Sequence, residues 1–348
     1  MALYSCSLMT GCDTRTRKDP EEMVDEIMND YADPKGPGAA VLVMHHDSII
    51  LSKGYGTADL DSAKAVTPKT NFRLASVTKQ FTAMGILLLA EKGALSLEDP
   101  LTKYFPDFPA YGREIRIRHL LTHTSGLVDY EDLIPDSVSR QVLDRDCLSL
   151  MHATDSLYFP AGSRYRYSNT GFALLALVTA EVGGMPFPAF IRKHIFDPLG
   201  MPTAVAYEQG LSTVAERAYG HSRDGEGWKR TDQSRTSAVL GDGGIYCNVI
   251  ELATWVSSLW KNTLISPEMQ RKAWSKAPVN DGGVIDYGYG WHLDGDSAKP
   301  HHDGSTLGFR NHILLYPETK SMVVVLTNRN EGEPRQLARR IAEVLVDR

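Results

Sequence analysis

The stretch GFRNHILLYPETKSMVVVLT, residues 308–327, decides the fold. Its two ends, residues 308–316 and 322–327, are apolar and rich in strand-forming residue types, and the Pro-Glu-Thr at 317–319 favours a turn between them. A similar β-rich run at residues 287–293 precedes them. The sequence therefore predicts a group of strands near the end of the chain.

Two more strand-like runs lie near the start, at residues 39–44 and 48–51. Apolar residues at helical spacing predict an opening helix over residues 19–30 and a closing helix from Pro334 to Leu345. Between about residues 95 and 260 the patterns are mainly helical and strand signals are scarce. Two clear helical patterns in that part are residues 171–182 and 250–259.

This order predicts an α+β fold, in which one antiparallel sheet is built from both chain ends and flanked by helices, with a mainly helical lobe inserted. We expect the sheet lobe at residues 19–75 and 261–348 and the helical lobe at 76–260. Residues 1–18 are expected to be a tail or the remnant of an export signal. Because ligands often bind where two lobes meet, we expect chemistry at their junction.

The bulk composition excludes several function classes. The 348 residues carry 43 acidic and 37 basic side chains in mixed order, for a net charge of −6, so we expect no nucleic-acid partner. No stretch approaches the roughly 20 apolar residues of a transmembrane helix. The four cysteines lack metal-type spacing, so neither a disulfide nor a zinc site is expected. They are Cys6, Cys12, Cys147 and Cys247.

The localisation stays open. The string LMTGC at residues 8–12 is similar to a lipoprotein cleavage site, but the stretch before it is short and lacks a basic start. If the start is as written, we expect a cytoplasmic protein with a tail that contains this string by chance. If the start is truncated, we expect a periplasmic protein or one anchored by lipid at Cys12.

Ser76 and Lys79 are the first candidate catalytic residues. They lie one helical turn apart at the start of an apolar helix predicted over residues 76–90, where a lysine amine can reach a serine hydroxyl. The same spacing recurs at Ser258 and Lys261, late in another helix. Only the first copy lies beside the unpaired N–H groups of a helix start, which can bind an oxyanion.

Tyr167-Ser168-Asn169 is the second candidate group. A phenol can relay a proton between serine and leaving group, and an asparagine amide can hold both a lysine and a substrate carbonyl. The triplet Tyr246-Cys247-Asn248 has the same pattern, and a buried tyrosine beside a turn asparagine explains either copy equally well. The first triplet gains its value in combination with Ser76.

The third candidate group is His302-Asp303-Gly304-Ser305, which we expect to form a polar turn before the strand at 308. The Ser305 N–H could bind a substrate carbonyl, and His302 could bind or polarise substrate. The small residues at 304 and 305 would permit close approach.

In this order, the three groups resemble the motifs of the serine β-lactamase and penicillin-binding protein superfamily. The second copies fail the order, since Ser258 follows Tyr246. Further strings similar to this family lie at residues 72–75, 97–100, 120–127, 243–244 and 287–291, so that the resemblance covers about residues 20–345. It implies a β-lactamase/transpeptidase-like fold and is greatest to the class C β-lactamase-like branch, with its D-alanyl-D-alanine peptidases, D-amino-acid amidases and family VIII esterases.

The resemblance implies double displacement: Lys79 and Tyr167 activate Ser76, and the N–H groups of Ser76 and Ser305 stabilise the oxyanion. Which of Lys79 and Tyr167 is the base stays open. Asn169, His302 and Gly304 are the other substrate-binding positions that it implies. We interpret His123, Ser125 and Asp303 as structural.

The third motif favours esters and D-amino-acid amides or peptides. Class C β-lactamases usually carry Lys-Thr-Gly there, whereas a typically neutral histidine stands at position 302. Arg310 is a candidate replacement cation.

The alternatives are a β-lactamase acting on cephalosporin-like substrates and a non-catalytic penicillin-binding protein. We expect a small-molecule ester, amide or β-lactam as partner, no cofactor and no metal, because the adjacent pairs His45-His46 and His301-His302 lack zinc-site spacing. Nothing in the sequence defines the oligomeric state.

Overall fold

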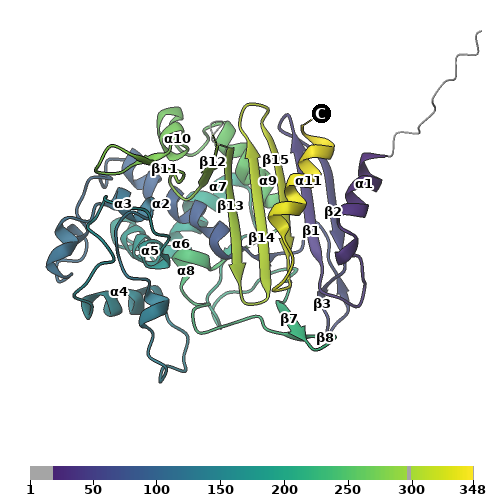
Figure 1. Ribbon diagram of the computed structural model, residues 1–348, viewed down its shortest axis with the longest axis horizontal. Coiled ribbons are helices and arrows are strands. Elements are labelled where there is room, and N and C mark those ends of the chain that lie inside the picture. The colour runs from purple at the N-terminus through teal and green to yellow at the C-terminus, as the bar shows by residue number, and fades with distance from the viewer. Residues whose placement is uncertain (1–18, 296–298, 348) are drawn as a thin grey trace, which may run out of the picture.

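The computed structural model describes residues 19–295 and 299–347. A six-stranded antiparallel sheet runs in the order β12-β13-β14-β15-β1-β2, so strands from both ends of the chain lie side by side (Figure 1). This arrangement confirms the predicted α+β fold. The strands are β1 (Ala39–His45), β2 (Ser48–Tyr55), β12 (His292–Asp294), β13 (Lys299–Thr306), β14 (Phe309–Tyr316) and β15 (Ser321–Thr327).

The central strand β15 explains the apolar stretch at residues 322–327. It pairs with β14 on one side and with β1 on the other, in a register that puts Val324 opposite Leu42. Met322, Val324 and Leu326 belong to the large apolar cluster of the helical side. Val323 and Val325 belong to a second cluster on the opposite face. Because side chains alternate along a strand, a strand covered on both faces is apolar at nearly every position.

Helices cover both faces of this sheet (Figure 1). On one face, α1 (Pro20–Ile27) packs against α11 (Pro334–Leu345), and their apolar residues complete the second cluster. On the other face, α9 (Val249–Trp260) packs against β1 and β15. Farther from the sheet, α2 (Lys79–Glu91) packs against α5 (Asn169–Gly183). The helices predicted near both termini and at residues 171–182 and 250–259 are therefore confirmed.

Short elements join these layers and bound the site. They are η2 (Ala75–Thr78), η5 (Tyr130–Leu133), α4 (Asp144–His152), α8 (Leu240–Gly243) and the small sheet of β5 (Phe72–Arg73), β9 (Ile245–Cys247) and β6 (Val205–Ala206). The remaining elements are η1 (Asn29–Tyr31), β3 (Thr57–Asp59), β4 (Lys64–Ala65), η3 (Leu101–Lys103), η4 (Ala110–Arg113), α3 (Ile117–Leu121), α6 (Phe187–Ile191), η6 (Arg192–Phe196), α7 (Asp197–Leu199), β7 (His221–Asp224), β8 (Gly227–Arg230), α10 (Pro267–Ala273), β10 (Ala277–Pro278) and β11 (Val284–Ile285).

Two local predictions were wrong. The strand expected at residues 287–293 is a loop followed by the short β12, because a Cβ at Gly288 would lie 2.2 Å from the Ala273 carbonyl oxygen and Gly290 has a φ of +77°. The turn expected at His302-Asp303-Gly304 is part of β13, and the chain turns only after Thr306. This polar segment forms a strand because it pairs along its whole length with β14.

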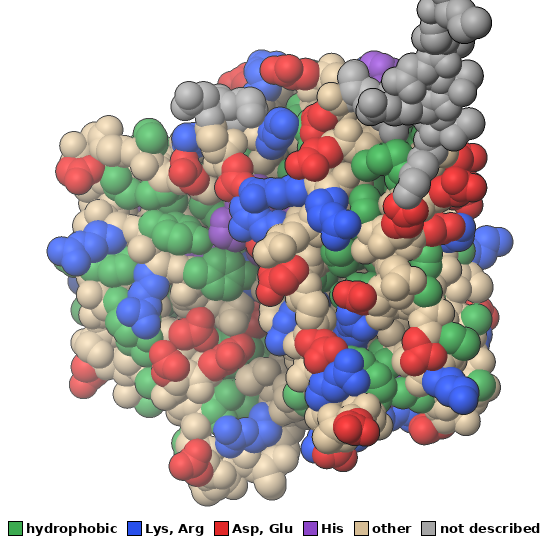
Figure 2. Space-filling model, turned by 45° about the vertical axis from the view of Figure 1, so that its right-hand side comes forward, with side chains coloured by type: hydrophobic (Ala, Val, Ile, Leu, Met, Phe, Trp, Pro, Cys, Tyr) green, Lys and Arg blue, Asp and Glu red, His purple; other side chains and the backbone are tan. Residues whose placement is uncertain are grey.

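The surface shown in Figure 2 carries interspersed side chains of both charge signs. Within the described residues, no single helix is long and apolar enough to cross a bilayer, and the one helix pair that passes by composition is bent by 73°. Cys147 and Cys247 are buried free thiols. The possible lipoprotein string, with Cys6 and Cys12, lies outside the described residues.

Candidate active site

Ser76 lies in the tight turn η2, immediately before α2 rather than within its first turn. The preceding Ala75 has a φ of +50°, a left-handed conformation that is costly for a residue with a Cβ. The chain is held in this bend by the Asn311 side chain on β14, whose Nδ2 donates to the carbonyl oxygens of Arg73 at 2.9 Å and Leu74 at 3.2 Å. The turn that presents Ser76 is therefore fixed against the sheet.

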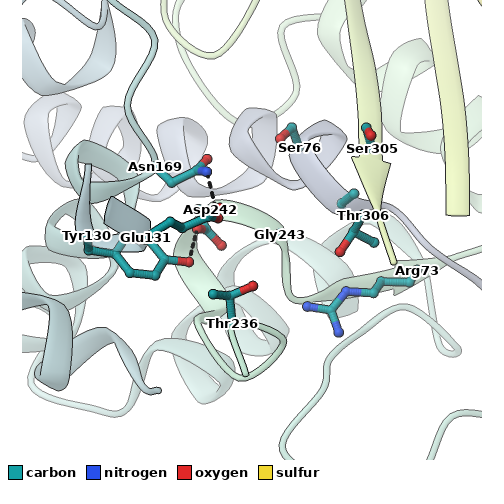
Figure 3. A pocket seen from close by; sticks show the side chains of 11 residues that line it. Arg73, Ser76, Tyr130, Glu131, Asn169, Thr236, Asp242, Gly243, Ser305 and Thr306 are labelled. Atoms are coloured by element: carbon teal, nitrogen blue, oxygen red, sulfur yellow. Dashed lines mark hydrogen bonds between the residues drawn. The ribbon is translucent and has the colours of Figure 1, made fainter. Parts of the chain in front are cut away.

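Gly304 brings β13 against the same bend. A Cβ at this position would lie 2.2 Å from the Leu74 carbonyl oxygen, so only glycine permits the contact. Strand β12 pairs with β13 only at Lys299–His301, and the rest of that edge faces η2. Ser305 and Ser76 consequently line one pocket, from the strand side and the turn side (Figure 3).

Lys79 is fully buried, and its ammonium group donates to three oxygens. The acceptors are Ser76 Oγ at 3.2 Å, Asn169 Oδ1 at 2.8 Å and the Asp242 carbonyl oxygen at 2.9 Å. Burial lowers the pKa of Lys79 from its ordinary value to about 8, although nearby carboxylates act in the opposite direction. A lysine of this pKa can exchange a proton with Ser76 near neutral pH.

Tyr167 lies beside this pair, with its ring centroid 4.9 Å from Lys79 Nζ. Its hydroxyl is buried and makes no hydrogen bond to another residue in the part of the chain that the structure describes. Burial raises the pKa of the Tyr167 phenol, while the neighbouring Ser76 hydroxyl acts to lower it. The His123 ring packs against the Tyr167 ring at a centroid distance of 4.2 Å. The phenol is thus held at the site with its hydroxyl available to a third group.

Asn169 joins Lys79 to the acidic side of the pocket. Its Nδ2 donates to Glu131 Oε1 at 3.1 Å, and its backbone N–H donates to Asp129 Oδ2 at 2.7 Å. The two carboxylates therefore fix both the start of α5 and the amide orientation that presents Oδ1 to Lys79.

Ser76 and Asn169 line a polar pocket of about 300 Å³, whereas Lys79 and Tyr167 lie behind its lining (Figure 3). Sequence reasoning placed Ser76, Asn169 and Ser305 there but gave no role to the side chains of several other lining residues. These are Arg73, Tyr130, Glu131, Thr236, Asp242 and Thr306. Tyr130 and Glu131 follow the family-like string at 120–127, and Asp242 directly precedes the one at 243–244, so these residues could have been suspected, whereas no sequence signal marks Thr236.

His302 does not line this pocket. Its Nδ1 donates to the Asp303 carbonyl oxygen at 2.7 Å, and its Nε2 accepts from the Tyr287 hydroxyl at 2.9 Å. Burial holds the pKa of the His302 imidazole well below its ordinary value, so the ring is neutral. Arg310 is also turned away, because its guanidinium donates to the carbonyl oxygens of Thr306 and Phe309. Neither side chain supplies a cation to the pocket.

The residues interpreted as structural have partners within the protein. The Ser168 N–H donates to His123 Nδ1 at 3.2 Å, and the Leu127 N–H donates to Ser125 Oγ at 3.3 Å. Asp303 pairs with His312 at 2.7 Å. These contacts hold the loops and the strand beside the pocket.

The repeated sequence patterns are separated by the structure. Ser258 Oγ donates to the Trp255 carbonyl oxygen, and Lys261 Nζ donates to Ser257 instead of Ser258. In the second Tyr-x-Asn triplet, Asn248 caps the start of α9. Context at a turn or within a helix, and not spacing alone, thus decides which copy forms a site.

Gly304→Ala is expected to lower the melting temperature by several degrees and to reduce activity. The added Cβ would collide with the Leu74 carbonyl oxygen and displace the Ser76 turn. Gly243→Ala is the matched control for stability, since its Cβ would meet Ala75 at an ordinary 3.6 Å. Thermal unfolding of both variants measures the difference, and equal melting temperatures would contradict the close approach described.

The family model described as Beta-lactamase matches residues 21–347. The chain is 32% identical to Penicillin-binding protein 4* of Bacillus subtilis (strain 168) over 84% of this chain and 68% of that protein. It spans about two thirds of the length of the curated relatives it matches.

Solved structures are also similar to this chain. An octameric penicillin-binding protein homologue from Pyrococcus abyssi has a TM-score of 0.79 at 26% identity, with 94% of this chain and 77% of that chain covered. The D-amino acid amidase of Ochrobactrum anthropi SV3, complexed with L-phenylalanine amide, has a TM-score of 0.80 at 22% identity over 95% and 99% of the two chains, and bears on the fold alone. The family match over nearly its whole length places this chain in the beta-lactamase family, as a serine hydrolase.

Proposed function

We propose that the protein hydrolyses esters or D-amino-acid amides and peptides through an acyl-enzyme at Ser76. The observation that carries this proposal is the buried Lys79 ammonium, 3.2 Å from Ser76 Oγ, beside the unpartnered Tyr167 hydroxyl. A serine hydroxyl needs a proton acceptor before it can attack a carbonyl carbon, and Lys79 in its neutral amine form or Tyr167 in its ionised form can be that acceptor.

The reaction proceeds in two displacements. Ser76 Oγ forms a bond to the substrate carbonyl carbon and gives its proton to Lys79 or Tyr167, and the N–H groups of Ser76 and Ser305 bind the oxyanion. The bond to the leaving group then breaks, and the leaving nitrogen or oxygen takes up a proton from the same groups. Water then attacks the acyl carbon and gives a proton to the same groups, and the bond between the acyl carbon and Ser76 Oγ breaks. Ser76 Oγ takes up that proton, and the acyl group leaves as a carboxylic acid.

The charge of the pocket supports this substrate class over β-lactams. Glu131 and Asp242 contribute carboxyl groups to the lining, while His302 is neutral and Arg310 is folded back onto the chain. The pocket's own guanidinium, Arg73, already donates to Gln233 and to the Ser237 carbonyl oxygen. In their ionised forms the two carboxyl groups repel a substrate carboxylate and attract an ammonium-bearing acyl group.

A substrate panel on the purified chain tests this proposal. Nitrophenyl esters, D-amino-acid anilides and nitrocefin are compared side by side. Turnover of esters or D-amino-acid anilides supports it. Turnover of nitrocefin alone would identify a β-lactamase instead, and absence of both turnover and covalent labelling would indicate a non-catalytic penicillin-binding protein.

Glu131→Gln is expected to reduce kcat/KM roughly 10-fold for a D-amino-acid anilide with a free amino group, because a charge-assisted contact is lost. The N-acetylated anilide, which has no ammonium group, is expected to change little. Asp132→Asn is the matched control. This neighbouring carboxylate accepts a hydrogen bond from the Tyr158 hydroxyl and does not line the pocket. Equal losses for both anilides would exclude an ammonium contact at Glu131.

A further inference from the structure

Asp242 lies in the wall of the pocket and is a buried residue, only 6% exposed. The Tyr130 hydroxyl donates to its Oδ2 at 2.9 Å, and its own carbonyl oxygen accepts from Lys79 Nζ. Its helix α8 is held from below by Asp144, whose carboxylate oxygens accept from the N–H groups of Leu240 at 2.9 Å and Gly241 at 3.0 Å. The carboxyl group of Asp242 is therefore fixed beside Lys79 by contacts from two other elements.

The geometric link between Asp242 and Lys79 is the backbone contact, in which Lys79 Nζ donates to the Asp242 carbonyl oxygen at 2.9 Å. The negative charge of the Asp242 carboxylate acts to raise the Lys79 pKa, against the effect of burial. Burial raises the pKa of the Asp242 carboxyl, and the Lys79 ammonium acts to lower it. Each charge thus favours the ionised form of the other.

Other titratable or charged groups face this pair from every neighbouring element. They are Asp129, Tyr130 and Glu131 at η5, Asp144 and Cys147 on α4, His123 and Tyr167 in loops, His302 on β13, and Arg73 in the pocket wall. Asp242 differs from the other carboxylates because it both lines the pocket and accepts a hydrogen bond from Lys79 Nζ through its backbone carbonyl oxygen.

We propose that Asp242 is a positioning residue of this reaction, whose buried carboxylate keeps a proton on Lys79 in the resting enzyme. The inference rests on the proposed acyl transfer at Ser76. With its proton retained, Lys79 satisfies all three of its oxygen acceptors, and the site remains ordered until substrate arrives. Removing the carboxylate charge makes Lys79 release that proton more readily.

Asp242→Asn tests the inference, because asparagine keeps an oxygen acceptor for Tyr130 and removes only the charge. The limb of the pH–rate profile that reports the titration of Lys79 is expected to move to lower pH by about one unit. Such a shift is a roughly tenfold decrease in the affinity of Lys79 for its proton. If neutral Lys79 is the base, the acid limb moves. If charged Lys79 assists Tyr167, the alkaline limb moves in the same direction.

The measured quantity is the rate at which a fluorophosphonate phosphonylates Ser76 between pH 5 and about pH 10, with thermal unfolding as the check on folding. Tyr130→Phe is the second variant. Loss of its hydroxyl keeps Asp242 protonated over a wider pH range, so the same limb is expected to shift in the same direction by less. Glu181→Gln is the control, because this exposed carboxylate lies about 18 Å along α5 from Asn169.

A profile in both variants that matches the unsubstituted protein would overturn the role of Asp242, as would a shift to higher pH. Titration of the Lys79 side chain by NMR in ¹³C-lysine-labelled protein, assigned with Lys79→Arg, provides a readout that needs no turnover. Failure of Ser76 to react with the fluorophosphonate in the unsubstituted protein would reject the proposed function. A Lys79 titration unchanged by Asp242→Asn would reject the inference alone.

Discussion

Ser76→Ala is expected to abolish covalent labelling and to lower kcat by at least about 10⁴-fold, the largest effect of any single change in this chain. The substitution removes the only atom that forms a bond to substrate in the proposed reaction. The Ser76 hydroxyl accepts just one hydrogen bond from Lys79 in the described residues, so the fold is expected to persist. The turnover rate with the best ester or anilide measures the loss of kcat, and circular dichroism of the variant shows whether the fold persists.

Ser258→Ala is the matched control, because Ser258 shares the spacing to a lysine but bonds the Trp255 carbonyl oxygen. This variant is expected to retain labelling and activity. Full activity in Ser76→Ala, or loss of labelling in Ser258→Ala alone, would show that the wrong copy of the pattern has been assigned.

Lys79→Met is expected to lower the acylation rate by about 10³-fold, which is the usual contribution of a positioned proton acceptor. Methionine fills a similar volume with a flexible apolar chain, so the helix α2 can remain packed. The Asn169 amide and the Asp242 carbonyl oxygen lose a donor, but no buried positive charge remains to be stabilised. The rate of fluorophosphonate labelling, followed by intact mass, measures the loss.

The control for this change is Lys261→Met, whose lysine pairs with Asp47 at the surface. It is expected to label at the unsubstituted rate. A Lys79→Met variant that acylates at near-normal rate would leave Tyr167 as the sole proton acceptor and would refute the role given to the lysine.

Much of the fold could be predicted because the periodicity of each long element reflects its burial. The apolar stretch at residues 322–327 predicts the central strand, whose two faces are covered by α9 and by α11. The segment at residues 287–293 was misjudged, since its β-rich residue types conceal the close approach of Gly288 to a neighbouring backbone. That approach involves Ala273, which is distant in the sequence and leaves no local signal.

The candidate site was predictable where its residues are close to a helix start, as at Ser76 and Lys79. The position of His302 was not, because the pattern His-Asp-Gly has the composition of a turn and only its pairing with β14 makes it a strand. Asp242 lies 163 residues from Lys79 in the chain, and their contact is created by the packing of α8 against α2. A contact between residues so far apart in the chain has no characteristic sequence spacing from which it could be predicted.

The most direct test of the central claim is peptide mapping of the unsubstituted protein after incubation with a fluorophosphonate and, separately, a fluorescent penicillin. We predict a single adduct, on the peptide that contains Ser76 and with its mass carried by that residue. An adduct on Ser258 or another residue, or no adduct from either reagent, would contradict the account.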